Sequence, residues 1–422
     1  MSKLVRIKEY EYIFCESPRH KIDDEKVISK KAFEELTQLI ADSSEQDGND
    51  HGTIFWQRGQ KLQARHYVGV IQTSDGTQVE ILPKIADSYK DEELQRILLK
   101  MLRTVGDLPY KSGQTASLQN AKFPLLEIFI RDFLECVDFL VKRGIRSDYV
   151  RQEDNLAFLK GKMLMSEQIK HNLVRQDKFY VQYDSFEVNR PENRLIKSSL
   201  QKILRITKHL RNQRLARELL FVFDEAPFSD EPKQDLKKCS KDRGMHYYKA
   251  SLEWCKLILN DESPVPTVGQ KTFRSFLFPM PQIFERYVAK KMSKALPEWK
   301  LSTQVSNKKL LSSQEWNTDL FVIKPDILLE KKQCKVIADT KWKLPDENDK
   351  ANKFNIHQGD LYQLFTYAKF YEARTVILIY PKTDNFEKTL HCEYVNQTCN
   401  VIFMSFDLKQ DQFDLSIFSR TQ

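Results

Sequence analysis

The chain has 422 residues, which is too long for one ordinary hydrophobic core, so two or three domains are expected. Hydrophobic residues make up 41% and charged residues 30%, a balance that excludes a chain disordered throughout. No apolar run reaches the roughly 18–20 residues of a membrane helix, and the net charge of +8 permits a polyanionic partner without requiring one.

The first ten residues alternate between polar and apolar side chains, without an apolar block followed by small residues. A secretory signal is therefore not expected, and the cytoplasm is the expected location, with no membrane association. Seven cysteines are scattered without any C-x-x-C pair, which favours reduced thiols over a zinc ribbon or disulfides.

Residues 1 to about 113 are expected to be β-rich. Two alternating runs flank an Asp75-Gly76 turn, which is a strong signal for a hairpin. The other expected elements are a strand within Val5–Phe14, helices at Ser29–Asp42 and Asp91–Val105, and an exposed acidic loop at Ser43–Gly52.

Residues 114–265 are expected to be helical. Apolar residues recur at helical spacing in Pro124–Val141 and Pro191–Leu210, an extended basic piece covers Tyr149–Phe186, and Ser229–Arg243 resembles a surface loop. The Tyr247-Tyr248 pair near Trp254 is assigned to the core rather than to a base-stacking platform. A basic run either follows a phosphate backbone or is a solvated face, and both interpretations stay open. The residues of this run are Lys160, Lys162, Lys170, His171 and Arg175.

Residues 266–422 show an α/β pattern that predicts a mixed sheet. A helix is expected at Pro281–Lys294 and another at Gly359–Tyr371. The expected strands are Asp319–Ile323, Asp326–Glu330, Lys335–Asp339, Thr375–Tyr380 and Val401–Leu408. The fold class is thus an α+β multidomain chain, with a β-rich N-terminal region (1–113), a helical middle region (114–265) and a C-terminal α/β core (266–422).

Two aspartates are the strongest candidates for catalysis. Asp326 opens one hydrophobic strand and Asp339 closes the next, so a strand, a turn and a returning strand bring both carboxylates to one place. Adjacent carboxylates repel unless a cation lies between them, and Mg²⁺ binds one or two carboxylates together with a substrate phosphate. The alternative is a surface β-turn whose strands end in charged residues.

Lys341 lies two residues beyond Asp339, and a period of two places both side chains on one face of the sheet. Its ammonium group could orient or deprotonate a water, or stabilise charge that develops on phosphorus.

Four further residues are weaker candidates. Gln363 and Tyr367 are spaced i, i+4 on one face of the expected helix, although such a pair usually lies at a core margin. Glu285 is placed on an amphipathic helix as a third metal ligand, where a solvated charge or salt bridge is the alternative. His357 precedes the second helix and could contact phosphate, but a loop histidine is usually incidental.

Pro325-Asp326 … Asp339-Thr340-Lys341 resembles the PD-(D/E)xK nuclease signature, and Gln363-x-x-x-Tyr367 resembles the element that follows it in the RecB-like branch. Most of the chain is similar to the McrC family, the nuclease subunits of modified-cytosine restriction systems. The segments that carry this wider resemblance are Val68–Ile71, Ile81–Ile85, Phe129–Leu134, Leu159–Met163 and Asn189–Lys197.

The resemblance implies a Mg²⁺-dependent endodeoxyribonuclease, a type IV restriction subunit that acts in defence on DNA. It also implies a McrB-like AAA+ GTPase hexamer as partner, with the N-terminal part docking in the ring and stimulating GTP hydrolysis. The chain has no G-x-x-x-x-G-K-[ST] motif, because Gly161-Lys162 lacks the preceding glycine and the hydroxyl residue, so no nucleotide binding of its own is expected.

Two other functions stay open. One is a non-catalytic regulator that keeps the fold and activates the motor, and the intact Asp326, Asp339 and Lys341 argue against it. The other is a stand-alone nuclease for repair or RNA processing, and the long N-terminal portion without a DNA-binding signature argues against that.

Overall fold

The computed structural model describes residues 3–17, 24–44, 54–85, 88–106, 108, 123–174, 177–240, 242–259, 274–313, 318–394 and 399–420. Contacts divide the chain into two compact units, 1–108 with 115–125 and 263–422, and 109–114 with 126–262. The first and last of the three expected regions therefore belong to one unit. No helix in the described ranges is long and apolar enough to cross a membrane.

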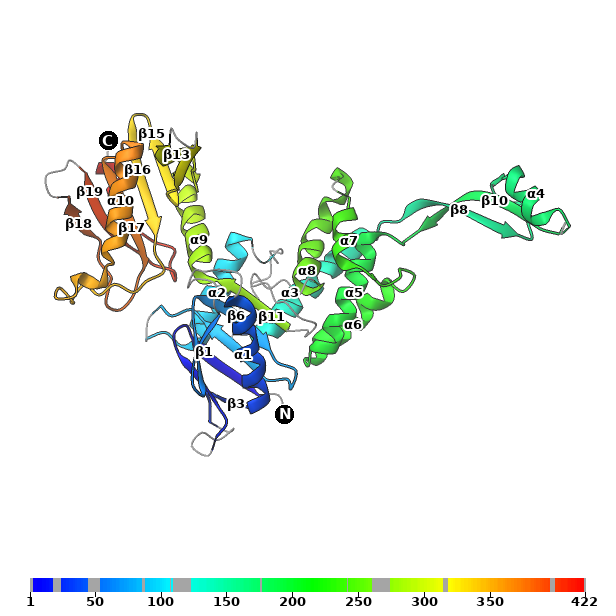
Figure 1. The fold of residues 1–422 in the computed structure, drawn as a ribbon, viewed down its shortest axis with the longest axis horizontal. Helices are drawn as coiled ribbons and strands as arrows, with labels where there is room; N and C mark the ends of the chain where they lie inside the picture. The colour runs from blue at the N-terminus through cyan, green and yellow to red at the C-terminus, as the bar shows by residue number, and fades with distance from the viewer. Residues whose placement is uncertain are drawn as a thin grey trace. The chain divides into compact units, whose positions relative to one another are not determined.

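The N-terminal part of the first unit contains two four-stranded sheets (Figure 1). The predicted hairpin is present as antiparallel β6 (Tyr67–Gln72) and β7 (Gln78–Leu82). The strand expected within Val5–Phe14 is instead two strands, because the chain turns at Tyr10, where φ is 67°. Strand β1 (Leu4–Lys8) pairs in parallel with β7, whereas β2 (Tyr12–Cys15) joins the second sheet with β3 (Val27–Ile28), β4 (Phe55–Arg58) and β5 (Lys61–Ala64).

The first of these sheets is completed from the far end of the chain. Strand β11 (Arg274–Pro279) pairs antiparallel with β6 and places Leu277 opposite Gly69. Gly69 has a φ of +130°, and a Cβ there would lie 1.9 Å from the Phe276 carbonyl oxygen. Only glycine allows this close approach of two backbones. The N-terminal sheet therefore requires residues that follow the middle region.

Two helices of this part match their predicted positions. Helix α1 spans Lys30–Ser44, and α2 spans Asp91–Val105. Helix α2 has three acidic residues in its first turn and ends at Gly106 in the left-handed conformation, as the helix dipole and the C-cap rule favour. Most of the loop expected at Ser43–Gly52 lies outside the described residues, and its first two residues belong to α1.

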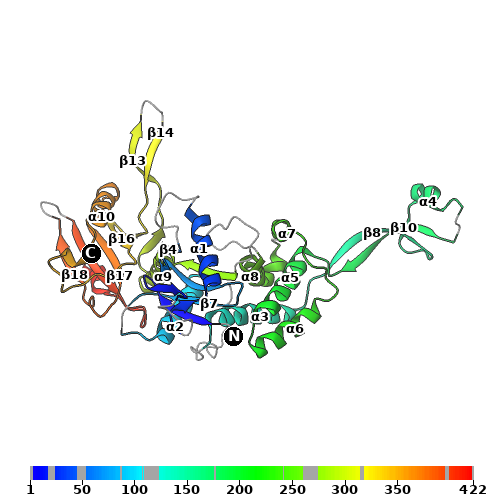
Figure 2. The ribbon, with the colours of Figure 1, turned by 60° about the horizontal axis from the view of Figure 1, so that its bottom comes forward.

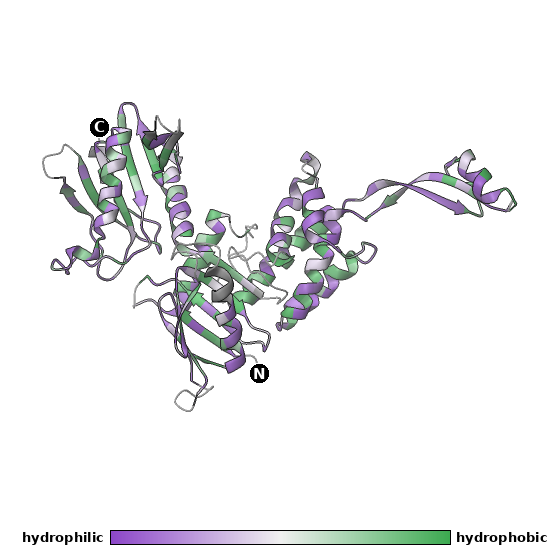
Figure 3. Cartoon of the chain, in the orientation of Figure 1, coloured by the Kyte–Doolittle hydropathy of each residue, from purple (hydrophilic) through white to green (hydrophobic). Residues whose placement is uncertain are grey.

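The C-terminal part of the first unit contains the expected mixed sheet. Its order is β12 (Lys300–Thr303), β15 (Ile327–Lys331), β16 (Cys334–Thr340), β17 (Thr375–Pro381), β19 (Asn400–Phe406) and β18 (Leu390–Glu393). Strands β16, β17 and β19 are parallel, and the remaining pairs are antiparallel. Hydrophobic residues line the inner strands β15, β16, β17 and β19, as Figure 3 shows.

Two helices accompany this sheet: α9 (Met280–Ala295) and α10 (Gln358–Tyr371), close to their predicted bounds. Leu364 and Tyr367 of α10 pack with Ile337 and Leu378 of the sheet in one buried core. Smaller elements are the ribbon of β13 (Lys308–Ser313) and β14 (Thr318–Ile323), seen in Figure 2, the 3-10 turn η3 (Lys353–Asn355) and α11 (Ser416–Arg420).

The second unit contains the helices α3 (Leu125–Arg143, which begins at the boundary), α5 (Pro191–Ile206), α6 (Leu210–Val222), α7 (Pro232–Lys238) and α8 (Lys249–Leu259), with the 3-10 turn η2 (Arg243–Tyr248). The expectation of a surface loop at Ser229–Arg243 was wrong in part, because this segment includes α7. Its polar residues have structural partners: Asp235 pairs with Arg194 at 2.6 Å. Tyr248 and Trp254 are fully buried, as the core assignment predicts, whereas Tyr247 is only half-buried.

The extended piece expected at Tyr149–Phe186 is a long antiparallel ribbon that leaves these helices (Figure 1). It consists of β8 (Asp148–Leu156) and β10 (Phe179–Glu187), with β9 (Lys162–Met163) and α4 (Met165–Asn172) at the far end. We call β9, α4 and residues 157–161, 164 and 173–174 the ribbon tip. Its exposed apolar side chains are Phe158, Leu159, Met165, Ile169, Leu173 and Val174.

The basic run lies on this ribbon tip. Lys160 is 3.8 Å from the centroid of the Tyr183 ring, and both Lys170 and His171 contact the Glu167 carboxylate. Arg175 lies outside the described residues. Local partners thus account for part of the run, and both interpretations of it stay open.

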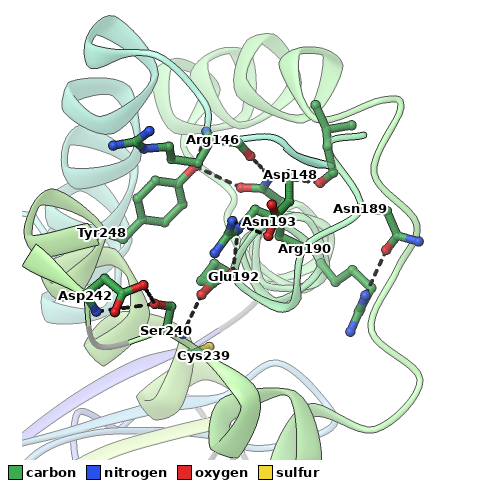
Figure 4. A network of polar contacts seen from close by, with 12 residues as sticks. Arg146, Asp148, Asn189, Arg190, Glu192, Asn193, Cys239, Ser240, Asp242 and Tyr248 are labelled. Atoms are coloured by element: carbon green, nitrogen blue, oxygen red, sulfur yellow. Dashed lines mark hydrogen bonds and ion pairs between the residues drawn. The ribbon is translucent and has the colours of Figure 1, made fainter. Parts of the chain in front are cut away.

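A buried polar network holds the base of the ribbon (Figure 4). The Asn193 amide donates to the carbonyl oxygens of Arg146 and Val188, which flank the two strands, and accepts from the Tyr248 hydroxyl at 2.9 Å. Arg190 pairs with Asp148 at 2.9 Å. The Asn189–Lys197 segment therefore has a structural role, because buried amides without partners would be costly.

Candidate active site

Asp326 and Asp339 meet at one end of the β15–β16 pair. The register pairs Ile327 with Ala338, so Asp326, one residue before β15, stands opposite Asp339. One Asp326 carboxylate oxygen accepts from the backbone N–H and the hydroxyl of Thr340, at 2.8 and 2.9 Å. Thr340 thus fixes the orientation of Asp326, a role that the sequence pattern did not reveal.

Lys341 follows the end of β16 and turns back toward Asp339. Its ammonium nitrogen lies 2.6 Å from Oδ2 of Asp339, and it donates to Oε1 of Gln363 at 3.1 Å. The Lys341 backbone N–H donates to the Ile379 carbonyl at 2.9 Å, which ties this segment to β17. The structure therefore brings Lys341 together with Asp339, as the period of two predicts, and with Asp326 from the neighbouring strand.

The electrostatics of this group are unbalanced. Asp339 is only 2% exposed, and burial together with the charge of Asp326 raises its pKa to about 7, against the opposing effect of Lys341. Burial opposes the charge of Lys341, but the carboxylates of Asp339, Asp360 and Asp326 outweigh it and raise the lysine pKa. An additional cation would stabilise the ionised form of Asp339.

Glu285 reaches the site from α9 through an intermediary. Nε2 of Gln304 contacts the Glu285 carboxylate and lies 3.4 Å from Oδ1 of Asp326. Burial and the negative charge of Asp326 raise the pKa of Glu285. Gln304 has a positive φ of 52°, and its N–H donates to the Asp326 carbonyl, so the backbone itself holds it beside the aspartate. No sequence signal pointed to Gln304.

These carboxylates fit a hard cation that keeps most of its water. Within the described ranges, no three His, Cys, Asp or Glu side chains form a ready metal-ligand group. Asp326 and Asp339 supply two carboxylates, and Mg²⁺ characteristically takes one or two with several waters and substrate oxygens. The donor set therefore suits Mg²⁺ at Asp326 and Asp339, with Glu285 at the margin behind Gln304.

Helix α10 contributes Gln363, which contacts the Lys341 ammonium group, and Tyr367, which contacts Gln363. The Gln363 amide nitrogen donates to the Tyr367 hydroxyl at 2.7 Å, and that hydroxyl donates to the Lys324 carbonyl at 3.1 Å. Tyr367 thus packs at the core margin and holds Gln363 through its hydroxyl, and its part in catalysis stays a prediction. His357 is exposed just before α10.

Sequence reasoning missed Asp360, in the first turn of α10. Asp360 pairs with Lys343 at 2.7 Å and lies 3.9 Å from the Lys341 ammonium. No periodic signal pointed to Asp360, because β16 ends at Thr340, before Lys341 and Lys343.

A buried glutamate links the N-terminal sheet to this site. Glu9 follows β1, is fully buried, and accepts from the indole N–H of Trp342 at 2.8 Å. The Trp342 ring packs against Phe284 with centroids 5.2 Å apart, and these two aromatics directly neighbour Lys341 and Glu285 in sequence. Burial raises the pKa of Glu9 to about 8, although Trp342 and Lys84 oppose the shift.

We expect the Glu9→Gln variant to be more stable than the wild type above neutral pH. Glu9 is neutral in the fold but ionised in the unfolded chain above about pH 4.5, so wild-type stability falls as pH rises from there to about 8. Glutamine keeps the acceptor for Trp342 and does not titrate. The advantage of the variant, measured by denaturant unfolding, should grow between pH 5 and pH 8 toward about 1–3 kcal/mol.

The exposed Glu16→Gln variant is the control and should show no such pH-dependent gain. A Glu9→Gln variant whose stability relative to wild type does not change with pH would contradict the buried neutral carboxyl.

The sheets and helices define a mixed α/β protein, and its site gathers acidic and basic side chains at the end of a mixed sheet. The profile of the McrBC 5-methylcytosine restriction system component family matches residues 62–381. Because this match covers more than half of the chain, the protein belongs to that family. A search of curated proteins gave no match.

Two solved structures from Thermococcus gammatolerans are similar. One, a half-complex from a tetradecameric assembly of McrB AAA+ hexamers with bound McrC, has a chain with a TM-score of 0.76 at 21% identity, covering 99% of both chains. The other, a cryo-EM structure of the McrBC complex, gives 0.56 at 23% identity over 71% of this chain and 89% of the other. At these identities the similarity shows a shared fold.

Proposed function

We propose that this chain is a metal-dependent endodeoxyribonuclease, the DNA-cutting subunit of a modification-directed restriction complex. The observation that carries the proposal is the meeting of Asp326, Asp339 and Lys341 at the end of β15 and β16, with the lysine 2.6 Å from Asp339. The family membership adds the restriction context.

Each side chain has a role in this chemistry. Asp326, held by Thr340, and Asp339 would bind Mg²⁺, which would supply charge neutralisation at the scissile phosphate. Lys341 would orient the attacking water and stabilise the negative charge that develops on the phosphate oxygens. Gln363 accepts a hydrogen bond from Lys341 and so directs the ammonium group.

The test is cleavage of 5-methylcytosine-containing and plain DNA by the full chain, with and without its candidate GTPase partner, in Mg²⁺ and in EDTA. We expect cutting of the modified DNA only with Mg²⁺, GTP and the partner. Cleavage that persists in EDTA would overturn the metal-dependent site.

A non-catalytic activator of the motor is the second candidate. The observation that favours it is that Lys341 already neutralises Asp339 at 2.6 Å. In the same assay an activator would raise GTP hydrolysis by the partner without any Mg²⁺-dependent cutting.

We further propose that the chain assembles with an AAA+ GTPase, as McrC does with McrB AAA+ hexamers in the similar Thermococcus gammatolerans assembly. Docking by residues 1–113 stays a prediction. Strands β6 and β7 of this region are buried along their full length. The ribbon tip offers a second surface. Its apolar side chains are 58–93% exposed, and exposed apolar patches mark interaction sites.

We expect Leu173→Ser in the ribbon tip to weaken stimulation of the partner's GTPase. The concentration of this chain that gives half-maximal stimulation should rise at least about 10-fold, because a leucine buried at an interface contributes ~1.5–3 kcal/mol. Leu210→Ser is the matched control, since Leu210 is 79% exposed on α6 and Leu173 is 72% exposed. Equal stimulation curves for the two variants would contradict a role of the ribbon tip.

A further inference from the structure

A cavity of about 700 Å³ lies beside the candidate active site, between α9 and β12. Glu285 and Gln304, which contact one another, line it together with Lys324, so the cavity adjoins Asp326. Its volume is within the range of pockets that hold organic ligands. The rest of the lining comes from α9, from β12 and from the last residue of α2.

Hydrogen-bond donors dominate the polar part of this lining. Helical spacing places Arg286 and Lys290 on one face of α9, i to i+4, and Lys324 adds a third cation from the segment before β15. Ser293 and Thr303 add hydroxyl donors. The one carboxylate, Glu285, belongs to the part of the lining that contacts the active site.

A donor-rich wall fits a ligand whose polar atoms are acceptors and whose charge is negative. Phosphodiester oxygens meet both conditions, and the apolar side chains of Val105, Ala289 and Leu301 fit the face of a deoxyribose. Such contacts position a strand without reading its sequence.

We propose that this cavity binds the sugar-phosphate backbone of the DNA strand next to the phosphate that is cut. The inference rests on the proposed nuclease function and assigns Arg286, Lys290 and Lys324 as strand-positioning residues. The backbone held there would fix the scissile phosphate in register with Asp326 and its neighbour Asp339, because Gln304 lines the cavity and also contacts Asp326.

The test compares Lys290→Ala with Lys294→Ala in the full chain. Both lysines are exposed on α9 and both substitutions remove one charge, but only Lys290 lines the cavity. Binding of a labelled DNA duplex is measured in Ca²⁺ across a salt series, and cleavage with the GTPase partner is measured in Mg²⁺. Deoxynucleoside monophosphate and inorganic phosphate serve as competitors.

We expect Lys290→Ala to reduce the slope of log K against log salt by about 0.9 and to raise the KM of cleavage with little change in kcat. Lys294→Ala should match the wild type, and neither small competitor should displace DNA at equal concentration. Identical slopes for the two variants, or displacement by the monophosphate alone, would overturn the proposal. If the wild type cuts DNA normally but Lys290→Ala and Lys294→Ala have the same salt slope, the cavity proposal is rejected and the nuclease proposal is not. If Lys290→Ala lowers the slope but no protein cuts DNA, the nuclease proposal alone is rejected.

Discussion

Asp339→Asn is expected to abolish DNA cleavage while leaving the fold at least as stable as the wild type. Asparagine keeps the size of the side chain but removes the charge that a cation requires. The loss should reach at least about 10³-fold, because several kcal/mol of transition-state stabilisation disappear with the metal.

Stability should change in the opposite direction. Burial and Asp326 raise the pKa of Asp339 to about 7, so its contribution to stability is present at acidic pH and is lost as pH rises through about 7. At pH 8 the Asn variant should therefore melt at the same or a higher temperature. Asp346→Asn is a control on a more exposed aspartate and should cut normally. Full cleavage by pure Asp339→Asn protein would refute the site.

Lys341→Met is expected to lose cleavage at least about 10²-fold and yet keep metal binding. The ammonium group is not a ligand, and at 2.6 Å it competes with a cation for Asp339. Calorimetric titration with Mg²⁺ should give an affinity equal to or higher than that of the wild type.

Lys343→Met is the matched control, because Lys343 pairs with Asp360 rather than with Asp339. It should cut DNA nearly as well as the wild type. If Lys341→Met loses metal binding as completely as Asp339→Asn does, the lysine has a different role from the one assigned.

Local periodicity was sufficient for the elements that carry the site. Helices α9 and α10 and strands β15 and β16 follow from short apolar patterns, and a period of two placed Asp339 beside Lys341. These relations need only neighbouring residues, so the sequence predicts them well.

Contacts between segments that are distant in the sequence could not be predicted from it. The Gln304 bridge joins residues from two other elements, and the Glu9–Trp342 hydrogen bond spans most of the chain. Strand β11 likewise completes a sheet whose other strands lie within the first 82 residues. No periodic signal reports such pairings, because they depend on how remote elements pack.

The position of β11 affects how the functions should be separated. A fragment ending at residue 265 would leave β6 with an open edge, which invites non-native pairing. Point variants of the full chain avoid this difficulty.

The most direct measurement follows GTP hydrolysis and DNA cleavage in one reaction containing the AAA+ partner, Mg²⁺, saturating GTP and methylated DNA. With Asp339→Asn, phosphate release should continue close to the wild-type rate while the DNA stays intact. DNA cut at the wild-type rate by this variant would contradict the claim that Asp326, Asp339 and Lys341 form the nuclease site.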